Sequence, residues 1–179
     1  MRGARIGSLI GSIGGLVFIL INAGSLAAPL DTVLRVLGGL AFAAVVWLTV
    51  VRPRPGGSPD GPPSRRAIRV YGTSVTAMAL AIPVGAGLIN NVLHRPELTV
   101  PWVVLAVGLH FLPFASAFEA PVFARLGWVL TAVAVAGAVL SLALGATAAA
   151  WTGVLAGFVL LGFSASGPGR AREQAVVTG

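Results

Sequence analysis

Long apolar runs separated by short polar segments dominate this sequence. There are six such runs, and each is close to the roughly 20 residues that a helix needs to cross the hydrocarbon core of a bilayer. Lipid offers no hydrogen-bond partner to an open backbone, so runs of this length must be helical. The predicted helices cover residues 6–28, 32–51, 68–93, 98–118, 121–144 and 146–164. The pattern therefore predicts an all-α integral membrane bundle of six transmembrane helices.

The basic residues lie between these runs and predict the orientation of the chain. Loops rich in Arg or Lys stay on the cytoplasmic side of a membrane. With a cytoplasmic N-terminus, only Arg35 and Arg95 fall outside, and ten arginines fall inside, namely Arg2, Arg5, Arg52, Arg54, Arg65, Arg66, Arg69, Arg125, Arg170 and Arg172. The bias towards Ala, Gly, Val and Arg without any Lys is typical of a GC-rich bacterial genome. We therefore expect a multi-pass protein of the bacterial cytoplasmic membrane with both termini cytoplasmic.

Composition excludes several other classes of protein. Hydrophobic residues make up 56% of the chain and charged residues 9%, whereas soluble domains carry about 25% charged residues. The net charge is +7, but nucleic-acid binding would place that charge on one folded face. The arginines here are spread between apolar runs, so we expect no nucleic-acid partner. The absence of Cys excludes disulfides and thiol chemistry.

A segment rich in Pro, Gly and Arg divides the chain. We expect a transmembrane hairpin over 1–51, a cytoplasmic linker over 52–66, a four-helix transmembrane region over 67–166 and a mobile tail over 167–179. The lipid bilayer itself is the first expected partner. Arginines beside a membrane attract anionic lipid, and the candidates in the linker are Arg52, Arg54, Arg65 and Arg66.

Two features of this organisation stay open. The start MRGAR, an apolar stretch and SLAAP together resemble a signal peptide cleaved after Ala27. The apolar stretch is longer than the usual 7–15 residues, which favours a membrane helix instead. The odd-numbered helices also begin with Arg followed by Gly, at Arg5, Arg69 and Arg125. Three repeated helical hairpins would explain that pattern, and so would the topology of the arginines alone.

Small residues at four-residue spacing predict close helix contacts. The stripes are Gly7, Gly11 and Gly15 in the first helix and Ala149, Gly153 and Gly157 in the sixth. Such stripes let helix backbones approach each other in lipid. They favour packing inside the bundle, and the alternative is a face for a homo-oligomer or a membrane partner.

The stretch VGLHFLPFASAFE places His110 deep inside the fourth apolar run. An ionisable residue at such depth is a candidate functional group, and Pro113 removes the N–H partner of a nearby carbonyl. Hydroxyl groups at similar predicted depth complete a candidate intramembrane site of His110, Pro113, Ser12, Thr76 and Thr131. The alternative is a neutral imidazole that only bonds to a neighbouring helix. At GLHFLPFA the chain resembles uncharacterised small bacterial membrane proteins, actinobacteria-like in composition, that share a Gly-Leu-His-Phe-x-Pro stretch; the resemblance implies no activity.

A second polar group falls at the predicted outer ends of the helices. Its candidate residues are Asn22, Asn90, Asn91, His94 and Arg95, with Asp31, Arg35 and Glu97 nearby. These side chains could line a polar mouth, and ordinary interfacial polarity is the alternative.

Recognisable catalytic motifs are absent. The sequence has no P-loop, no dinucleotide fingerprint and no HExxH. His94 and His110 lie on different segments, and no carboxylate lies mid-membrane, so three or four converging zinc ligands are not supplied. We expect no enzyme, no metal and no cofactor. Three functions remain: binding or transport of a small solute near His110, a structural or accessory membrane subunit that packs through its glycine stripes, and, least favoured, an intramembrane enzyme.

Overall fold

The computed structural model describes residues 2–50 and 64–166, with side chains from 7–49 and 64–166. Its elements are α1 (Arg2–Ala23), α2 (Leu30–Val50), α3 (Arg65–Asn91), the 3-10 helix η1 (Pro96–Leu98), α4 (Thr99–Ala117), α5 (Pro121–Leu144) and α6 (Ala146–Ser166). The six α-helices of this part of the chain confirm the all-α prediction. Most of the predicted linker 52–66, with Arg52 and Arg54, and the predicted tail 167–179 lie outside the described residues. The division into domains therefore stays a prediction.

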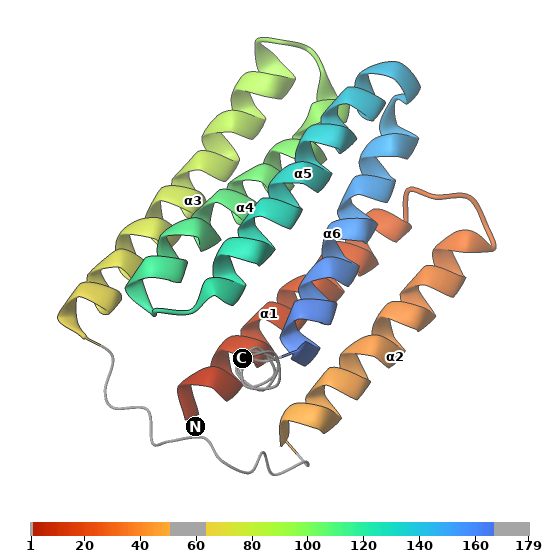
Figure 1. Cartoon of the computed structure of the whole chain (residues 1–179). Helices are drawn as coiled ribbons and strands as arrows, with labels where there is room; N and C mark the ends of the chain where they lie inside the picture. The colour runs from red at the N-terminus through yellow and green to blue at the C-terminus, as the bar shows by residue number, and fades with distance from the viewer. Residues whose placement is uncertain (1, 51–63, 167–179) are drawn as a thin grey trace, which may run out of the picture.

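The helices run alternately up and down and form a curved row (Figure 1). Their order in space is α3, α4, α5, α6, α1 and α2, because α4 packs on α5, α5 on α6 and α6 on α1. The three hairpins are α1 with α2, α3 with α4 and α5 with α6. The most extensive contacts, α4 with α5 and α1 with α6, join different hairpins. The three hairpin turns lie at the end of the bundle that carries η1, which we call the η1 end. Helices α2 and α3 form the two edges of the row.

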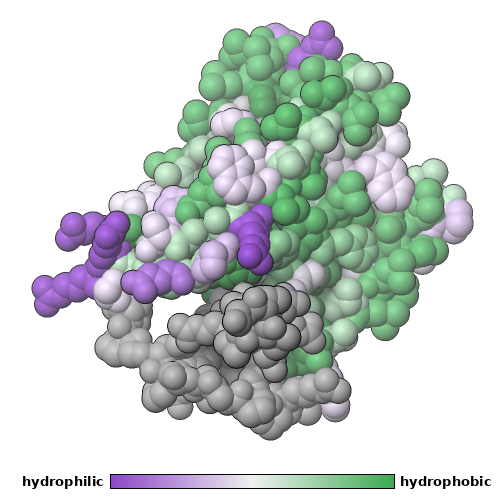
Figure 2. Space-filling model, in the orientation of Figure 1, coloured by the Kyte–Doolittle hydropathy of each residue, from purple (hydrophilic) through white to green (hydrophobic). Residues whose placement is uncertain are grey.

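The length and the composition of its helices indicate that the chain is a polytopic membrane protein. Five helices are long and apolar enough to cross a membrane: α2, α3, α4 together with η1, α5 and α6. The apolar part of α1, Gly7–Ala23, is shorter, so its predicted role as a sixth span stays a prediction. Hydrophobic residues cover most of the face seen in Figure 2, and the hydrophilic ones gather towards its ends. Such a surface suits contact with lipid rather than water.

Two helix ends differ from the predicted ones for local reasons. Helix α3 begins at Arg65, because the Ser64 side chain caps its first turn by accepting a hydrogen bond from the Ala67 N–H at 3.1 Å. Arg65 and Arg66, both exposed, thus belong to a helix and not to the linker. Helix α1 ends at Ala23 rather than near residue 28, and the following residues form the turn into α2.

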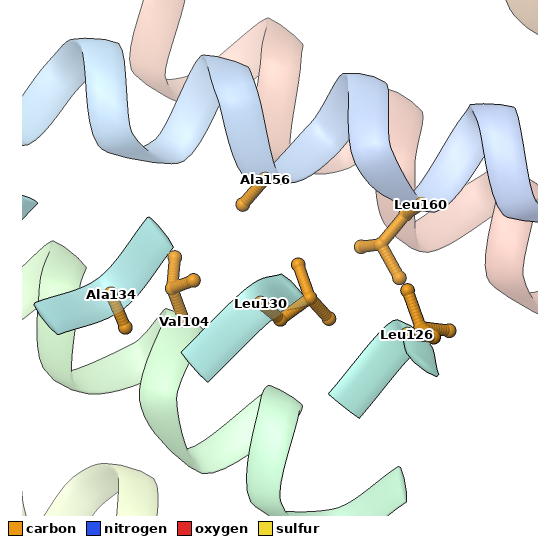
Figure 3. Close-up of a cluster of buried hydrophobic side chains, with 6 residues drawn as sticks. All are labelled: Val104, Leu126, Leu130, Ala134, Ala156 and Leu160. Carbon is orange, nitrogen blue, oxygen red and sulfur yellow. The ribbon is translucent and has the colours of Figure 1, made fainter. Parts of the chain in front are cut away.

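Helix α6 lies at the centre of the bundle and carries much of its buried surface. One cluster joins α4, α5 and α6 through Val104, Leu126, Leu130, Ala134, Ala156 and Leu160 (Figure 3). Two further clusters join α6 to α1 and to α2 around Val154 and Leu161. A central helix lined by small side chains lets several neighbours approach it closely.

Glycines provide the closest helix contacts, as the sequence predicted. A Cβ built on Gly157 would lie 2.6 Å from the carbonyl oxygen of Gly15, and one built on Gly15 would lie 2.7 Å from that of Gly157. Gly108 of α4 and Gly127 of α5 meet in the same way, with corresponding distances of 3.1 and 2.9 Å. The stripes of α1 and α6 therefore pack against each other within one chain, although Gly7 faces open space.

Candidate functional site

His110 lies half-buried in α4, and its ring bonds to its own helix. Its Nδ1 lies 2.5 Å from the carbonyl oxygen of Val107, a contact that requires the proton on Nδ1. Nε2 forms no hydrogen bond with the described residues. The nearest rings belong to Phe111, with centroids 4.1 Å apart, and Phe114, at 5.4 Å. The imidazole is thus surrounded by its own helix and by aromatic rings.

Aromatic side chains from three helices extend this cluster. Phe114 stacks on Tyr71 of α3 with centroids 5.6 Å apart, and it meets Phe123 of α5 edge-on at 5.8 Å. Ring pairs at these separations attract each other beyond the burial of their area. The surroundings of His110 therefore resemble a packing cluster that joins α3, α4 and α5.

A hydroxyl group does reach the region of His110, but it belongs to a residue that the sequence analysis did not choose. Ser74 Oγ of α3 donates a hydrogen bond of 2.8 Å to the carbonyl oxygen of His110. Pro113 lies one turn later and withholds an N–H from the helix at this level. The bond therefore joins α3 to α4 where the backbone of α4 is weakened. Thr76, two residues from Ser74, lies on the opposite side of α3 and is exposed.

The other predicted partners of His110 lie elsewhere. Ser12 is fully buried in α1 and donates to the Leu9 carbonyl oxygen of its own helix at 2.9 Å. Thr131 lies on α5, where its backbone N–H faces Gly108, and its buried hydroxyl has no hydrogen-bond partner among the described residues. Neither of them bonds to His110. The structure brings Pro113 and His110 together with Ser74, and it leaves Ser12, Thr76 and Thr131 apart.

The second predicted group lies at the η1 end, but its members point in different directions. Three of them are exposed on the α3 side: Asn90 donates to Ala86 O and to Thr99 Oγ1, Asn91 donates to Gly87 O, and His94 Nδ1 lies 3.0 Å from Val92 O. Asn22 lies apart from them in α1, with 8% of its surface exposed. Asn90, Asn91 and His94 of the predicted polar mouth are therefore exposed surface residues, whereas Asn22 is buried.

Asn22 lines a cavity of about 260 Å³ at the η1 end, between α1, η1 and the turn from α5 to α6. The other lining residues are Ser25, Pro96, Glu97, Val100, Gly145, Ala146, Ala149 and Ala150. Gly153 makes room for the amide, because a Cβ there would lie 2.2 Å from the Asn22 side-chain carbon Cγ. The cavity combines three polar side chains with an apolar wall.

The hydrogen bonds of Asn22 leave one atom free. Its Nδ2 donates to the carbonyl oxygen of Phe18 one turn earlier at 2.8 Å. Its Oδ1 forms no hydrogen bond with the described residues. The buried side-chain atoms without a hydrogen-bond partner among the described residues are Thr131 Oγ1 and Ser141 Oγ, so Asn22 Oδ1 is open to solvent. An accessible amide oxygen on the wall of a cavity can accept a hydrogen bond from a bound molecule.

Glu97 supplies the negative charge of this cavity. Its Oε1 lies 3.5 Å from an Arg95 guanidinium nitrogen, and the two side chains are 18% and 59% exposed, respectively. This distance exceeds the roughly 2.7–2.9 Å of a strong charge-assisted hydrogen bond. The ion pair is loose, and Arg95 is not among the residues that line the cavity.

Metal ligation has no support at this site. Among the residues that the structure describes, no group of three or more His, Cys, Asp or Glu side chains could hold a metal ion. Glu97 is the single acidic side chain that lines the cavity. What the arrangement can do is bind a small molecule through hydrogen bonds and one charge.

A second hollow lies on the outside of α3. It is lined by Gly72, Thr73, Thr76, Ala77 and Leu80 and has a volume of about 420 Å³. Every lining residue comes from α3, so the hollow is a dent in a helix surface rather than an enclosed site.

Comparisons with protein-family models, with curated proteins and with solved structures find no match for this chain. Its function must therefore be argued from its own residues.

Proposed function

We propose that this polytopic membrane protein binds a small polar solute in the cavity at its η1 end. The observation that carries the proposal is Asn22, which is 8% exposed, lines the cavity and keeps an acceptor oxygen, Oδ1, that no described residue bonds. A protein hydrogen bond contributes about 0.5–1.5 kcal/mol net. A bound solute that donates to Oδ1 gains such a bond.

The proposal includes an orientation, with the η1 end facing the outside of the cell. Two described arginines, Arg35 and Arg95, lie at that end, whereas Arg65, Arg66, Arg69 and Arg125 lie at the other. The excess of basic residues at one end supports a cytoplasmic location for it. The cavity then opens to the outer solution, from which it takes its solute.

We assign His110 to helix packing rather than to solute binding. Its Nδ1 bonds within α4, and its backbone carbonyl accepts from Ser74. The cavity of the η1 end is not lined by His110. The proposal thus moves the solute site from the middle of α4 to the end of the bundle.

We also propose binding rather than catalysis. A hydrolytic site needs a nucleophile within hydrogen-bond reach of a general base. Ser25 and Glu97 are the hydroxyl and the carboxylate of the cavity, and no hydrogen bond joins them in the described part of the chain. The lining residues support recognition of a molecule and supply no means of activating it.

Substitution of Asn22 tests the proposal. Asn22→Leu keeps the size of the side chain and removes both polar atoms, so we expect it to abolish the stabilisation that a bound solute gives. The measurement is thermal unfolding of the purified protein in lipid nanodiscs, followed by tryptophan fluorescence, with a panel of small polar solutes. A ligand at about 100 times its Kd stabilises the folded state by about 2.7 kcal/mol.

Asn91→Leu is the matched control. Asn91 also donates its Nδ2 to the carbonyl four residues earlier, at 3.0 Å, but it is exposed and lies outside the cavity. This variant should keep the full response to the solute. A panel that leaves the wild-type melting curve unchanged would refute the proposal, as would a response that survives in Asn22→Leu.

A second candidate function, an accessory subunit that binds a membrane partner, is favoured by the edge helix α3. Within the described bundle α3 packs on α4 and on η1, and its small residues around Thr76 form a hollow that no other element fills. Small residues on an open helix face promote association in lipid. Native mass spectrometry of the protein extracted from its own membrane distinguishes this function, because it would show a bound protein subunit.

A further inference from the structure

We infer that the solute is a primary ammonium cation, carried by a small amine or amino acid and held by Asn22, Ser25 and Glu97. This inference rests on the proposed function and names the chemistry of its ligand. It is argued from the hydrogen-bonding capacity, the charge and the size of the cavity at the η1 end.

The polar groups of the cavity are mainly acceptors. The donor of Asn22 is occupied by Phe18 O, which leaves the acceptor Oδ1. Glu97 is acceptor-only when ionised, and the Ser25 hydroxyl can accept as well as donate. An ammonium group carries three donors and no acceptor. It therefore matches three acceptor side chains that line one cavity.

The charge of the cavity also selects a cation. Glu97 is its single acidic side chain, and the guanidinium that faces it, Arg95, is mostly exposed and 3.5 Å away. Exposed ion pairs contribute about 0–1 kcal/mol, so Arg95 is easily displaced. An ammonium cation inside the cavity can replace Arg95 at Glu97, whereas an anionic solute would be repelled by the carboxylate.

The start of α6 allows the ammonium group to belong to an amino acid as well as to a simple amine. Ala146, Ala149 and Ala150, from its first turns, line the same cavity. The free N–H groups of a helix N-terminus carry a partial positive charge and attract carboxylates. An amino acid could place its ammonium group at Glu97 and its carboxylate at this helix end, and a simple amine would use Glu97 alone.

The remaining wall limits the size of the solute. Pro96, Val100 and the alanines of α6 present apolar surface, which suits a short alkyl group. The volume of about 260 Å³ lies below the roughly 300–1,000 Å³ of sites for drug-sized ligands. The cavity thus fits a solute smaller than a drug-sized ligand.

Isothermal titration calorimetry of the full chain in nanodiscs tests the inference with four probes of similar size. They are propylammonium, alanine, propanol and propionate, which carry an ammonium group, a zwitterion, a hydroxyl group and a carboxylate. We expect propylammonium or alanine to bind. The one that binds more tightly shows whether the natural solute is a simple amine or an amino acid. Propanol and propionate should bind more weakly by about tenfold or more, since hydrogen bonds to charged groups are the stronger ones.

Two substitutions next to the cavity should change the affinity in opposite directions. Glu97→Gln keeps the size of the side chain and removes its charge, so it should weaken ammonium binding by about tenfold to hundredfold. Arg95→Gln removes the competing cation and should strengthen binding. The matched controls are Glu119→Gln and Arg125→Gln, at the opposite end of the bundle, and both should bind as the wild type does. A merely structural role of Glu97 and Arg95 would not produce effects of opposite sign.

The outcomes separate the inference from the proposed function. If propanol or propionate binds best and Asn22→Leu abolishes that binding, the ammonium assignment is wrong and the cavity remains the solute site. If ammonium binding is unaffected in Glu97→Gln, the assignment is also wrong. If none of the four probes binds to the wild-type protein, both the assignment and the proposed function are overturned.

Discussion

His110 shows how a buried ionisable residue can serve packing. Its ring is held by the Val107 carbonyl and by two phenylalanine rings, and its own carbonyl accepts the hydroxyl of Ser74. Polar groups inside a membrane helix are costly unless they are paired. Nδ1 is paired within α4, and the backbone carbonyl is paired with Ser74 of α3, so one of these bonds joins the two helices.

Ser74→Ala should therefore weaken the packing of the edge helix α3 on α4. The substitution removes a hydrogen bond between helices, and its expected cost is about 0.5–1.5 kcal/mol. Ser116→Ala is the matched control, because Ser116 is exposed and donates to Pro113 O of its own helix at 3.1 Å. The measurement is denaturant unfolding in mixed micelles, followed by circular dichroism. Equal stabilities of the two variants would contradict the role assigned to Ser74.

The choice of partner for His110 marks a limit of sequence reasoning at this scale. Depth along a helix follows from counting residues. The count placed Thr76 of α3 at the depth of His110, and Ser74, two residues away, contacts His110. Depth does not fix the direction in which a side chain points. Thr76 and Ser74 are two residues apart, which is about 200° around a helix, so only one of them can face α4. The same limit applies to Asn22 and Asn91, which share an end of the bundle but not a face.

At the scale of elements, α6 organises the molecule. Its small residues face α1 along one side, and Ala156 and Leu160 meet α4 and α5 on another. Ser8 of α1 also donates a hydrogen bond to the carbonyl oxygen of Ser164. Helix α1 is thus built into the core through α6.

Gly157→Ala tests the backbone-to-backbone contact between α6 and α1. The added methyl group would meet the backbone of Gly15 at 2.6 Å, and backbone cannot move aside as a side chain can. Overpacking of this kind costs about 1–3 kcal/mol. Gly162→Ala in the same helix is the control, because nothing lies within 4 Å of its added Cβ, and alanine is the better helix former. Thermal unfolding should show a large loss for the first variant alone, and a similar loss in both would argue against the contact.

The apolar runs predicted most of the helical architecture. In lipid the backbone has no alternative to a helix, so the length and order of the runs translated directly into α2 to α6. Helix ends were less certain where polar residues continue a helix, as Arg65 does behind its Ser64 cap. The order of the helices in space was not predictable. A glycine stripe indicates that a helix packs closely against a neighbour, but it does not indicate which helix that neighbour is.

At the scale of the whole molecule, the packed middle of the bundle is separate from the proposed solute site. Its middle is filled by apolar clusters and glycine contacts, and the edges α2 and α3 present apolar surface to lipid. The cavity with Asn22 and Glu97 lies at the η1 end, where three turns meet. A membrane protein built in this way can bind a solute at one surface while its core stays closed.

Labelling of a cysteine at position 25 tests this account most directly. The chain contains no Cys, so Ser25→Cys introduces a single thiol on the wall of the cavity. The measurement is the rate of reaction with a membrane-impermeant maleimide in intact cells, with and without propylammonium and alanine. His94→Cys, at the same end but outside the cavity, and Glu119→Cys, at the opposite end, are the controls.

We predict that Ser25→Cys reacts in intact cells and that one of the two ammonium compounds slows this reaction. His94→Cys should react at a rate that neither compound changes, and Glu119→Cys should react only after the membrane is opened. A thiol at position 25 that reacts only in opened membranes would contradict the proposed orientation. A thiol that reacts in intact cells at the same rate with and without both compounds would contradict solute binding in the cavity.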